Sequence, residues 1–281
     1  MGKSAHKKRE YLLGHSTQEL ARLAKQAEFY RELTRNLLIC AGIAPGMRVL
    51  DFGTGAGDVA LLLSELVGES GEVIAVDRAP EALERAQYRL SELGIKNVRI
   101  VAGDDNSLPG MFANQPVDAA VGRLVLLHQA DPLAVFSKIL ECVRPGGIVV
   151  FQEIDGESQV WTKPALPLMS QVYGWISRTL LEAGTPGDIG ATLVRAFDQA
   201  DIQGRHIARE GMLESGPQAM GYDYYADVIQ TLLPLMEKIK VATAAEVQLD
   251  TLAARLREEA VSRQAIFIPI FFIGAYGRKP G

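Results

Sequence analysis

The chain has 281 residues, 48% of them hydrophobic, so it can bury the core of one large α/β domain or of one domain with insertions. Its net charge of -5 and the lack of a strong basic block argue against nucleic acid as a partner, because phosphate neutralisation needs clustered Lys and Arg. The two cysteines do not have metal-ligand spacing, so we expect neither a metal centre nor a disulfide framework. The sequence shows no leader-like apolar region and no apolar run of about 18 residues, which predicts a cytoplasmic protein without membrane contact.

The N-terminal segment carries an amphipathic helix. From Thr17 to Leu38 apolar side chains recur at intervals of three and four residues, and the pattern stops before Gly42. We assign residues 1–42 to an N-terminal helical lid. Packing of this helix at the edge of a sheet is the other interpretation.

The stretch 47–63 organises the rest of the chain. A short apolar run passes through Asp51 into three alternating glycines, and an apolar segment with helical spacing follows, which predicts a strand, a tight turn and a helix. Glycine suits a turn where a ligand approaches the main chain closely, as at the nucleotide-binding end of an open α/β sheet. A dinucleotide fingerprint would place its last glycine at Asp58, where an acid repels a pyrophosphate, so an NAD site is disfavoured.

The next two predicted strands also end in acids. The strand at 72–77 ends at Asp77, 22 positions beyond Gly55, and this spacing suits a carboxylate that accepts both ribose hydroxyls. Capping of the following helix, predicted at 80–93, is the alternative role of Asp77. A third strand at 98–101 reaches Gly103-Asp104-Asp105, a sequence that on its own is typical of a turn.

Two further strands complete the predicted core, which we bound at 43–155. The fourth strand, at 117–121, leads into a loop with Arg123 and His128, and the fifth follows an Arg-Pro-Gly-Gly turn at 144–147. The aromatic, Pro- and Gly-rich residues 156–190 predict an irregular insertion that contributes to an acceptor pocket. We assign 191–281 to the remainder of the core, with a helical insertion at 215–262 and a final strand at 266–276. Within the insertion, helices are predicted at about 227–240 and 244–262.

The pattern Asp51-x-Gly53-x-Gly55-x-Gly57 resembles the first motif of class I S-adenosylmethionine (SAM) dependent methyltransferases, and four strand ends match that family in order over about 110 residues. Thr54 stands where Cys or Ser is frequent, but a hydroxyl is kept. The wider resemblance is to a bacterial small-molecule group related to the ubiquinone/menaquinone methyltransferases, many of whose members tailor natural products. It is carried by residues 11–16, 123–128, 151–155 and 274–280. The quinone-biosynthesis signatures themselves are not evident, so a ubiquinone substrate is not implied.

The resemblance implies a Rossmann-like sheet of seven strands with the last one antiparallel, SAM as methyl donor and S-adenosylhomocysteine as product. It implies that Arg78 borders the adenine and that Asp104 accepts from the adenine amino group. The residues that we assign to the cofactor are Tyr11, Asp51, Gly53, Thr54, Gly55, Gly57, Asp77, Arg78, Gly103, Asp104, Asp105 and Arg123.

Methyl transfer from a sulfonium is an in-line displacement, so the protein mainly aligns donor and acceptor and excludes water. A base is needed only if the nucleophile must lose a proton. We take His128 as the first candidate and Glu153 as the second, although His128 could equally be a histidine hydrogen-bonded within its loop. The candidates for the acceptor pocket are His15 and aromatic side chains that could instead belong to the core, namely Trp161, Tyr173, Trp175, Tyr222 and Tyr225.

We therefore expect a methyltransferase that acts on a small molecule, with an aromatic or indole-type secondary metabolite as the acceptor and O, N or C as the methylated atom. A SAM-binding protein without turnover and an RNA methyltransferase are the alternatives, and the charge disfavours the second. A homodimer is left open.

Overall fold

The computed structural model describes residues 30–154, 156, 159–185 and 187–281. Tyr11, His15 and most of the predicted helical lid lie outside these residues. Residues 30–41 are helical, and the helix ends before Gly42, which has a φ of +94°.

The core of the structure is one seven-stranded sheet with the strand order β3-β2-β1-β4-β5-β10-β7. All pairs among the first five strands are parallel, whereas β10 is antiparallel to both β5 and β7. This arrangement confirms the predicted Rossmann-like sheet. Its strands are β1 (Arg48–Phe52), β2 (Glu72–Asp77), β3 (Val98–Ala102), β4 (Val117–Arg123), β5 (Val143–Ile154), β7 (Gln203–Glu210) and β10 (Phe272–Arg278).

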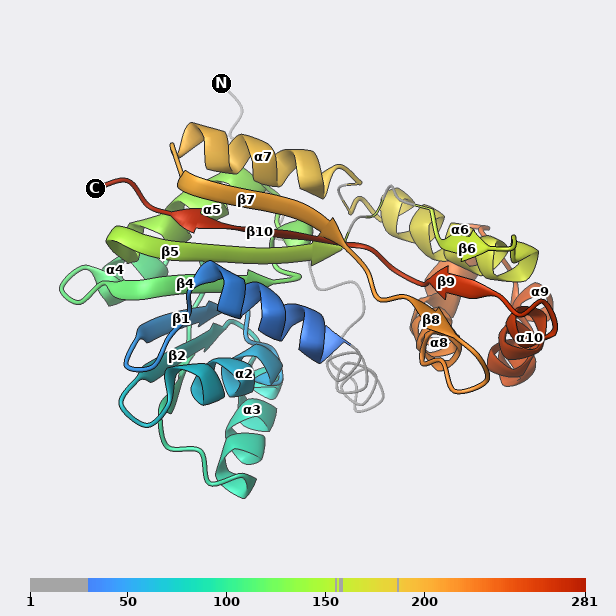
Figure 1. The fold of residues 1–281 in the computed structure, drawn as a ribbon, viewed down its shortest axis with the longest axis horizontal. Helices are drawn as coiled ribbons and strands as arrows, with labels where there is room; N and C mark the ends of the chain where they lie inside the picture. Colours follow the sequence, from blue (N-terminus) through green and yellow to red (C-terminus); the bar gives the residue numbers. More distant parts are fainter. Residues whose placement is uncertain (1–29, 155, 157–158, 186) are drawn as a thin grey trace.

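Helices cover both faces of this sheet, because its central strands are apolar on both sides. Val49 and Leu50 are adjacent in β1, and each belongs to the hydrophobic core on a different face. One face carries the helix at 30–41 with α2 (Asp58–Val67) and α3 (Pro80–Glu92) (Figure 1). The other face carries α4 (Leu108–Phe112), α5 (Pro132–Glu141) and α7 (Ile189–Gln199).

A second unit lies beyond the carboxyl ends of the parallel strands (Figure 1). It has a hydrophobic core of its own, and the chain passes between the two units four times, after residues 154, 182, 210 and 268. Its small sheet has the order β6 (Trp161–Lys163), β9 (Ile266–Ile268) and β8 (Glu214–Ser215). Its helices are α6 (Pro167–Glu182), α8 (Gly221–Lys238), α9 (Ala244–Val247) and α10 (Leu249–Ser262).

Three sequence predictions are wrong in this unit. The stretch 156–190 is not irregular, because it contains the 16-residue helix α6. The predicted strand 266–276 is two strands in different sheets, separated at 269–271, where Pro269 cannot donate to a strand ladder. The helix predicted over 244–262 is interrupted at Gln248, which has a left-handed φ of +50°.

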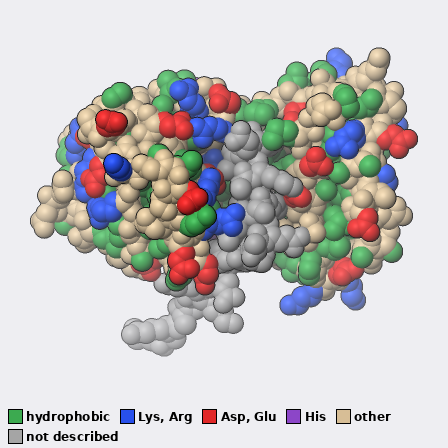
Figure 2. All heavy atoms as spheres, turned by 90° about the horizontal axis from the view of Figure 1, so that it is seen from below, with side chains coloured by type: hydrophobic (Ala, Val, Ile, Leu, Met, Phe, Trp, Pro, Cys, Tyr) green, Lys and Arg blue, Asp and Glu red, His purple; other side chains and the backbone are tan. Residues whose placement is uncertain are grey.

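The surface mixes charges of both signs. In Figure 2 basic and acidic side chains are interspersed over both units on the face that is shown. Among the described residues no helix has the length and apolar character needed to cross a membrane.

Candidate functional site

A cavity of about 300 Å³ lies where the carboxyl ends of β1 to β5 meet the second unit. Side chains from both units line it, so it is a cleft between the sheet and the helices α6 and α8. The predicted site residues that line it are Gly53, Thr54, Gly55, Asp77, Arg78, Gly103, Asp104, Asp105, Arg123, His128 and Tyr173.

The glycine loop after β1 is tied to the end of β2. The amide of Gly55 donates to Asp77 Oδ2 at 2.9 Å, and Asp77 Oδ1 accepts from the amide of Ala79 at 3.0 Å. Gly53 and Gly55 have φ values of +74° and +54°, a region that side chains disfavour. A Cβ on Gly53 would lie 2.5 Å from Val125 Cγ2, whereas a Cβ on Gly55 would enter space with no protein atom within 4 Å. The loop therefore leaves room for a ligand directly above Gly55.

Asp51 Oδ2 and Thr54 Oγ1 are buried next to this loop, and neither atom has a well-directed hydrogen-bond partner among the described residues. The Thr54 hydroxyl still lowers the pKa of Asp51 through a side-chain hydrogen bond, so the two groups face each other beside the cavity. A ligand that carries a donor would complete their hydrogen bonds. Burial raises the pKa of Asp51 to about 7. The residues of this end therefore fit the amino-acid part of SAM, whose ammonium group is a donor and a cation.

Gly57 has a different place. It does not line the cavity but precedes α2 with a φ of +85°, and a Cβ there would lie 3.2 Å from Ala86 Cβ on α3. The third glycine therefore allows close contact between α2 and α3. Asp58, which begins α2, lines the cavity and accepts from Arg89 Nη1 at 2.7 Å.

The acids after β3 are also held by the protein. Asp104 Oδ1 accepts from the amides of Asn106 and Ser107 at 3.1 and 3.2 Å, which fixes the turn before α4. Asp105 forms an ion pair with Lys138 Nζ at 2.6 Å. Both residues line the cavity, so the turn presents its main chain and Asp104 to the cavity.

Arg123 joins the end of β4 to the helix at 30–41. Its Nη1 donates to Thr34 Oγ1 at 3.3 Å, and that hydroxyl donates to Gln152 Oε1 at 2.7 Å. Gln152 is buried, and its Nε2 has no partner among the described residues. Thr34 and Gln152 were not predicted as site residues. The sequence feature that could have indicated Gln152 is its position directly after the apolar run 148–151, where a polar residue ends a buried strand.

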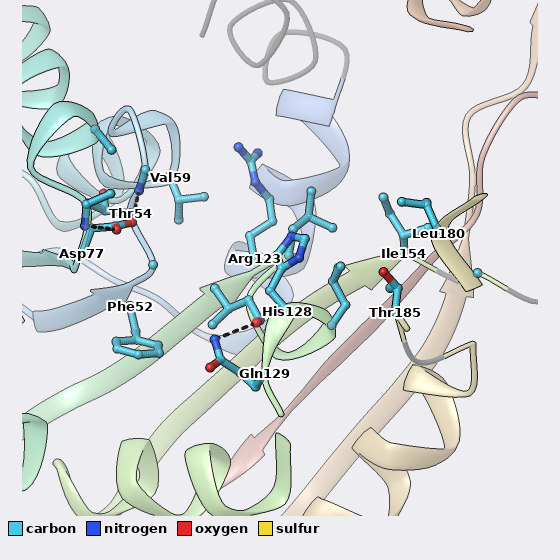
Figure 3. A pocket seen from close by; sticks show the side chains of 18 of the residues that line it. Phe52, Thr54, Val59, Asp77, Arg123, His128, Gln129, Ile154, Leu180 and Thr185 are labelled. Atoms are coloured by element: carbon cyan, nitrogen blue, oxygen red, sulfur yellow. Dashed lines mark hydrogen bonds between the residues drawn. The ribbon is translucent and has the colours of Figure 1, made fainter. Parts of the chain in front are cut away.

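His128 lies in the middle of the cavity. In Figure 3 Thr54 and Asp77 lie on one side of it, and Leu180 and Thr185 lie on the other. Burial and the nearby positive charge of Arg78 lower the pKa of His128 to about 4. The imidazole is therefore neutral at neutral pH and can accept a proton.

Glu153 does not share this cavity, and its predicted role as a base is corrected by the structure. Its side chain is fully buried behind the loop that carries His128. Its carboxylate accepts from the amides of Val125 at 3.1 Å, Leu126 at 2.8 Å and Leu127 at 3.4 Å. Burial raises the pKa of Glu153 to about 7. A group enclosed in this way has no path to an acceptor in the cavity.

The far side of the cavity is lined by regular stripes on two helices of the second unit. Tyr173, Ile176 and Leu180 lie on one face of α6, and Tyr224, Val228 and Leu232 lie on one face of α8. Within each helix these positions are three or four residues apart, which is the spacing of one helix face. Such stripes could have been found from the sequence once the helices were known.

Four aromatic residues predicted for the pocket do not line it. Trp161 is on β6 and is 42% exposed, and Trp175 packs against the core of the second unit. Tyr222 and Tyr225 are buried in the core of the second unit, where their hydroxyls donate to the carbonyls of Gly216 and Pro269. Their rings belong to the core, and among the described residues Tyr173 and Tyr224 are the tyrosines that line the cavity. The described residues contain no cluster of three potential metal ligands.

Comparison with known proteins supports this arrangement. A family model described as "Methyltransferase domain" matches residues 43–181. The protein-L-isoaspartate O-methyltransferase of Methanococcus maripaludis is 39% identical over 37% of this chain and 46% of its own. The ubiquinone/menaquinone biosynthesis C-methyltransferase UbiE of Coxiella burnetii is 34% identical over 48% of this chain and 51% of its own. The chain thus spans about half the length of these curated relatives.

Among solved structures, the YcgJ protein of Bacillus subtilis is 18% identical, covers 89% of this chain and 99% of its own, and has a TM-score of 0.59. At that identity the likeness concerns the fold alone. Sequence and fold agree on the core, where the glycine loop and the acids at the strand ends meet. Residues 43–181 therefore match the methyltransferase-domain family, and this part of the chain is similar to UbiE and to other methyltransferases that use SAM.

Proposed function

We propose that the protein transfers the methyl group of SAM to a small molecule that is uncharged and largely apolar. The observation that carries this is the composition of the acceptor side of the cavity. Among the residues that the structure describes, those that line it from α6, α8 and the adjoining connections are Ile, Leu, Val, Tyr, Ser, Thr and Gly, and none of these is ionised at neutral pH. A charged acceptor would be buried there without a partner, which is strongly unfavourable.

An aromatic or indole-type secondary metabolite fits this proposal. Tyr173 and Tyr224 line the cavity from different helices, and planar acceptors gain from offset or edge contacts with such rings. Ser177 and Thr185 add hydroxyl groups that can orient a polar substituent. Nucleic acid is not favoured as the acceptor, because charges of both signs are mixed on the surface and the net charge is -5.

His128 is the group that we assign to the acceptor proton. In the transfer the S–CH3 bond of the sulfonium breaks, a bond forms between CH3 and the acceptor atom, and the neutral thioether leaves. An acceptor that starts as O–H or N–H also loses a proton, which the neutral imidazole of His128 accepts and later returns to solvent. The cavity supplies alignment and excludes water, which is most of what this reaction needs.

The test uses SAM with a deuterated methyl group and a panel of indoles, phenols and naphthols, with mass spectrometry of both products. We expect the label in the acceptor and an equal amount of S-adenosylhomocysteine, and fragmentation of the product identifies the methylated atom. Tight SAM binding without labelled product from this panel or from a cell extract would favour a SAM-binding protein without turnover. Salt-sensitive labelling of RNA would favour the nucleic-acid alternative.

A cavity-filling variant tests the acceptor side separately. Val228→Trp should raise the KM for the acceptor by about tenfold or more and leave the Kd for SAM unchanged, because Val228 lines the side contributed by the second unit. Val194→Trp, on the exposed side of α7, is the matched control and should change neither quantity. Equal effects of the two substitutions would contradict the proposed acceptor side. A homodimer remains a separate prediction, which light scattering tests.

A further inference from the structure

The loop that carries His128 has an unusual construction. After β4 the chain turns at Leu124, which has a φ of +56°, a conformation that is uncommon for a residue with a side chain. The turn Leu126–His128 follows at once. The first amides of such a turn have no partners within it, and the preceding residues are Leu124 and Val125, which offer no capping oxygen.

Glu153 supplies the missing acceptors from a neighbouring strand. Its Oε1 accepts from the amides of Val125 and Leu126 at 3.1 and 2.8 Å, and its Oε2 faces the amide of Leu127 at 3.4 Å. A second link joins the same strands, because the amide of Leu124 donates to the carbonyl of Gln152 at 2.9 Å. The loop is thus held at four successive amides by two adjacent residues of β5.

The same loop touches both halves of the cavity. Its side chains Leu124, Val125, Leu127, His128 and Gln129 line the cavity, and Gln129 Nε2 donates to the carbonyl of Val125 at 3.1 Å. Val125 also limits the space at Gly53 of the glycine loop. A shift of the loop would therefore move the imidazole relative to donor and acceptor together.

A buried carboxylate is an expensive way to hold a loop. No charged side chain contributes to the shift of the pKa of Glu153, so three amides are the main favourable contacts of its ionised form. Burial is the largest effect on the pKa of Glu153, and the hydrogen bonds from the three amides only partly offset the cost of burying the charge. The arrangement therefore points to placement of the loop more than to stability of the fold.

We infer that Glu153 is a positioning residue, whose carboxylate fixes the loop 124–129 so that His128 faces the reacting methyl group. It acts through the main chain and touches neither donor nor acceptor. The part of this inference that concerns rate rests on the proposed methyl transfer, whereas the part that concerns the loop does not.

Glu153→Gln tests the inference, because glutamine keeps the shape but presents an N–H donor to one of the three amides. Hydrogen exchange at Val125–Leu127 should accelerate by about tenfold or more, which corresponds to the loss of one charge-assisted hydrogen bond. The kcat should fall by about tenfold or more and the Kd for SAM should change by less than about threefold.

Glu259→Gln is the matched control. Glu259 also accepts from the amides at the start of a helix, those of Leu168 and Met169 on α6, at 2.9 and 3.2 Å. Neither of these residues nor Glu259 lines the cavity. This control should loosen the first turn of α6 and leave both the exchange at Val125–Leu127 and kcat unchanged.

Unchanged exchange at Val125–Leu127 in Glu153→Gln would overturn the inference. So would faster exchange in a variant with wild-type kcat. If the wild type methylates no acceptor, the proposed function fails, and hydrogen exchange at Val125–Leu127 still decides whether Glu153 holds the loop. If Glu153→Gln does not fold, Glu153→Asp keeps the charge and shortens the reach, and the same two readouts apply.

Discussion

Asp51→Asn should make the protein more stable at neutral pH and impair its ability to bind SAM. Asp51 is buried at the end of β1, and burial raises its pKa from 3.8 to about 7. A raised pKa in the folded state means that the unfolded chain releases the proton first. The contribution of the protonated acid to stability is therefore complete below about pH 4 and is lost as the pH rises to about 7.

The size of the effect follows from the shift in pKa. A shift of about three units corresponds to about 4 kcal/mol of stability lost by the wild type over the whole window. Between pH 5 and pH 8 the accessible part is about 3 kcal/mol. The asparagine amide carries its own cost of about 1–3 kcal/mol for unpaired buried donors, but that cost does not depend on pH.

The assay is urea unfolding of wild type and variant between pH 5 and pH 8 without ligand. The free energy of unfolding of the variant minus that of the wild type should rise by about 3 kcal/mol across this range, since other titrating groups cancel in the difference. A difference that stays constant with pH would refute the reasoning. Addition of SAM should stabilise the wild type and have a much smaller effect on the variant.

Asp118→Asn is the control of opposite sign. Burial alone would raise the pKa of Asp118, but its hydrogen bonds with the amide of Arg48 and the guanidinium of Arg144 lower the pKa instead. Its contribution to stability is present above the unfolded pKa and is lost only as the pH falls below it. This variant should therefore be less stable than the wild type by a constant amount between pH 5 and pH 8, with an unchanged response to SAM.

Further substitutions test three parts of the site, namely the end of β2, the glycine loop and His128. Asp77→Ala should raise the Kd for SAM at least about tenfold in calorimetry, because the ribose hydroxyls lose their charged acceptor. Glu72→Ala, at the other end of β2, is the control and should leave this Kd unchanged. An Asp77→Ala variant with the Kd of the wild type would contradict the ribose assignment. Gly53→Ala should lower the melting temperature, because the new Cβ would clash with Val125. Gly55→Ala should mainly weaken SAM binding, because its Cβ enters the space left for the ligand. A larger loss of melting temperature in Gly55→Ala than in Gly53→Ala would contradict the geometry of the loop. His128→Gln should reduce kcat by about a hundredfold with an O–H acceptor and keep the Kd for SAM, and full activity would exclude His128 as the base.

The cofactor end of the site was predictable because its signals are local. Glycines after one strand and acids after the next two follow each other in the sequence, and parallel strands bring their carboxyl ends to one edge. Which face a side chain takes was harder to predict. Gln152 and Glu153 are adjacent in β5, yet one faces the helix at 30–41 and the other lies behind the His128 loop.

The acceptor side could not be predicted in the same way, since it depends on contacts between distant segments. β6 and β9 pair although about a hundred residues separate them, and no local pattern announces such a sheet. Pro167 is one of the prolines that led us to predict an irregular insertion at 156–190. It occupies the first position of α6, where the proline does not destabilise the helix because that N–H would have no partner within the helix. On α8, Tyr224 faces the cavity and Tyr225 the core, so the aromatic cluster alone could not identify the lining residue.

The fourfold passage of the chain between the two units bears on how acceptor preference can be altered. A module joined by a single linker can be exchanged as one contiguous fragment, but here the acceptor side is made of two separate inserts, at 155–188 and 211–271, which pack on each other. A chimera that replaces only one of them would face a foreign surface in the shared hydrophobic core. Recombination between relatives should therefore give a folded protein when both inserts come from the same parent and the intervening α7 and β7 come from the parent that supplies the sheet.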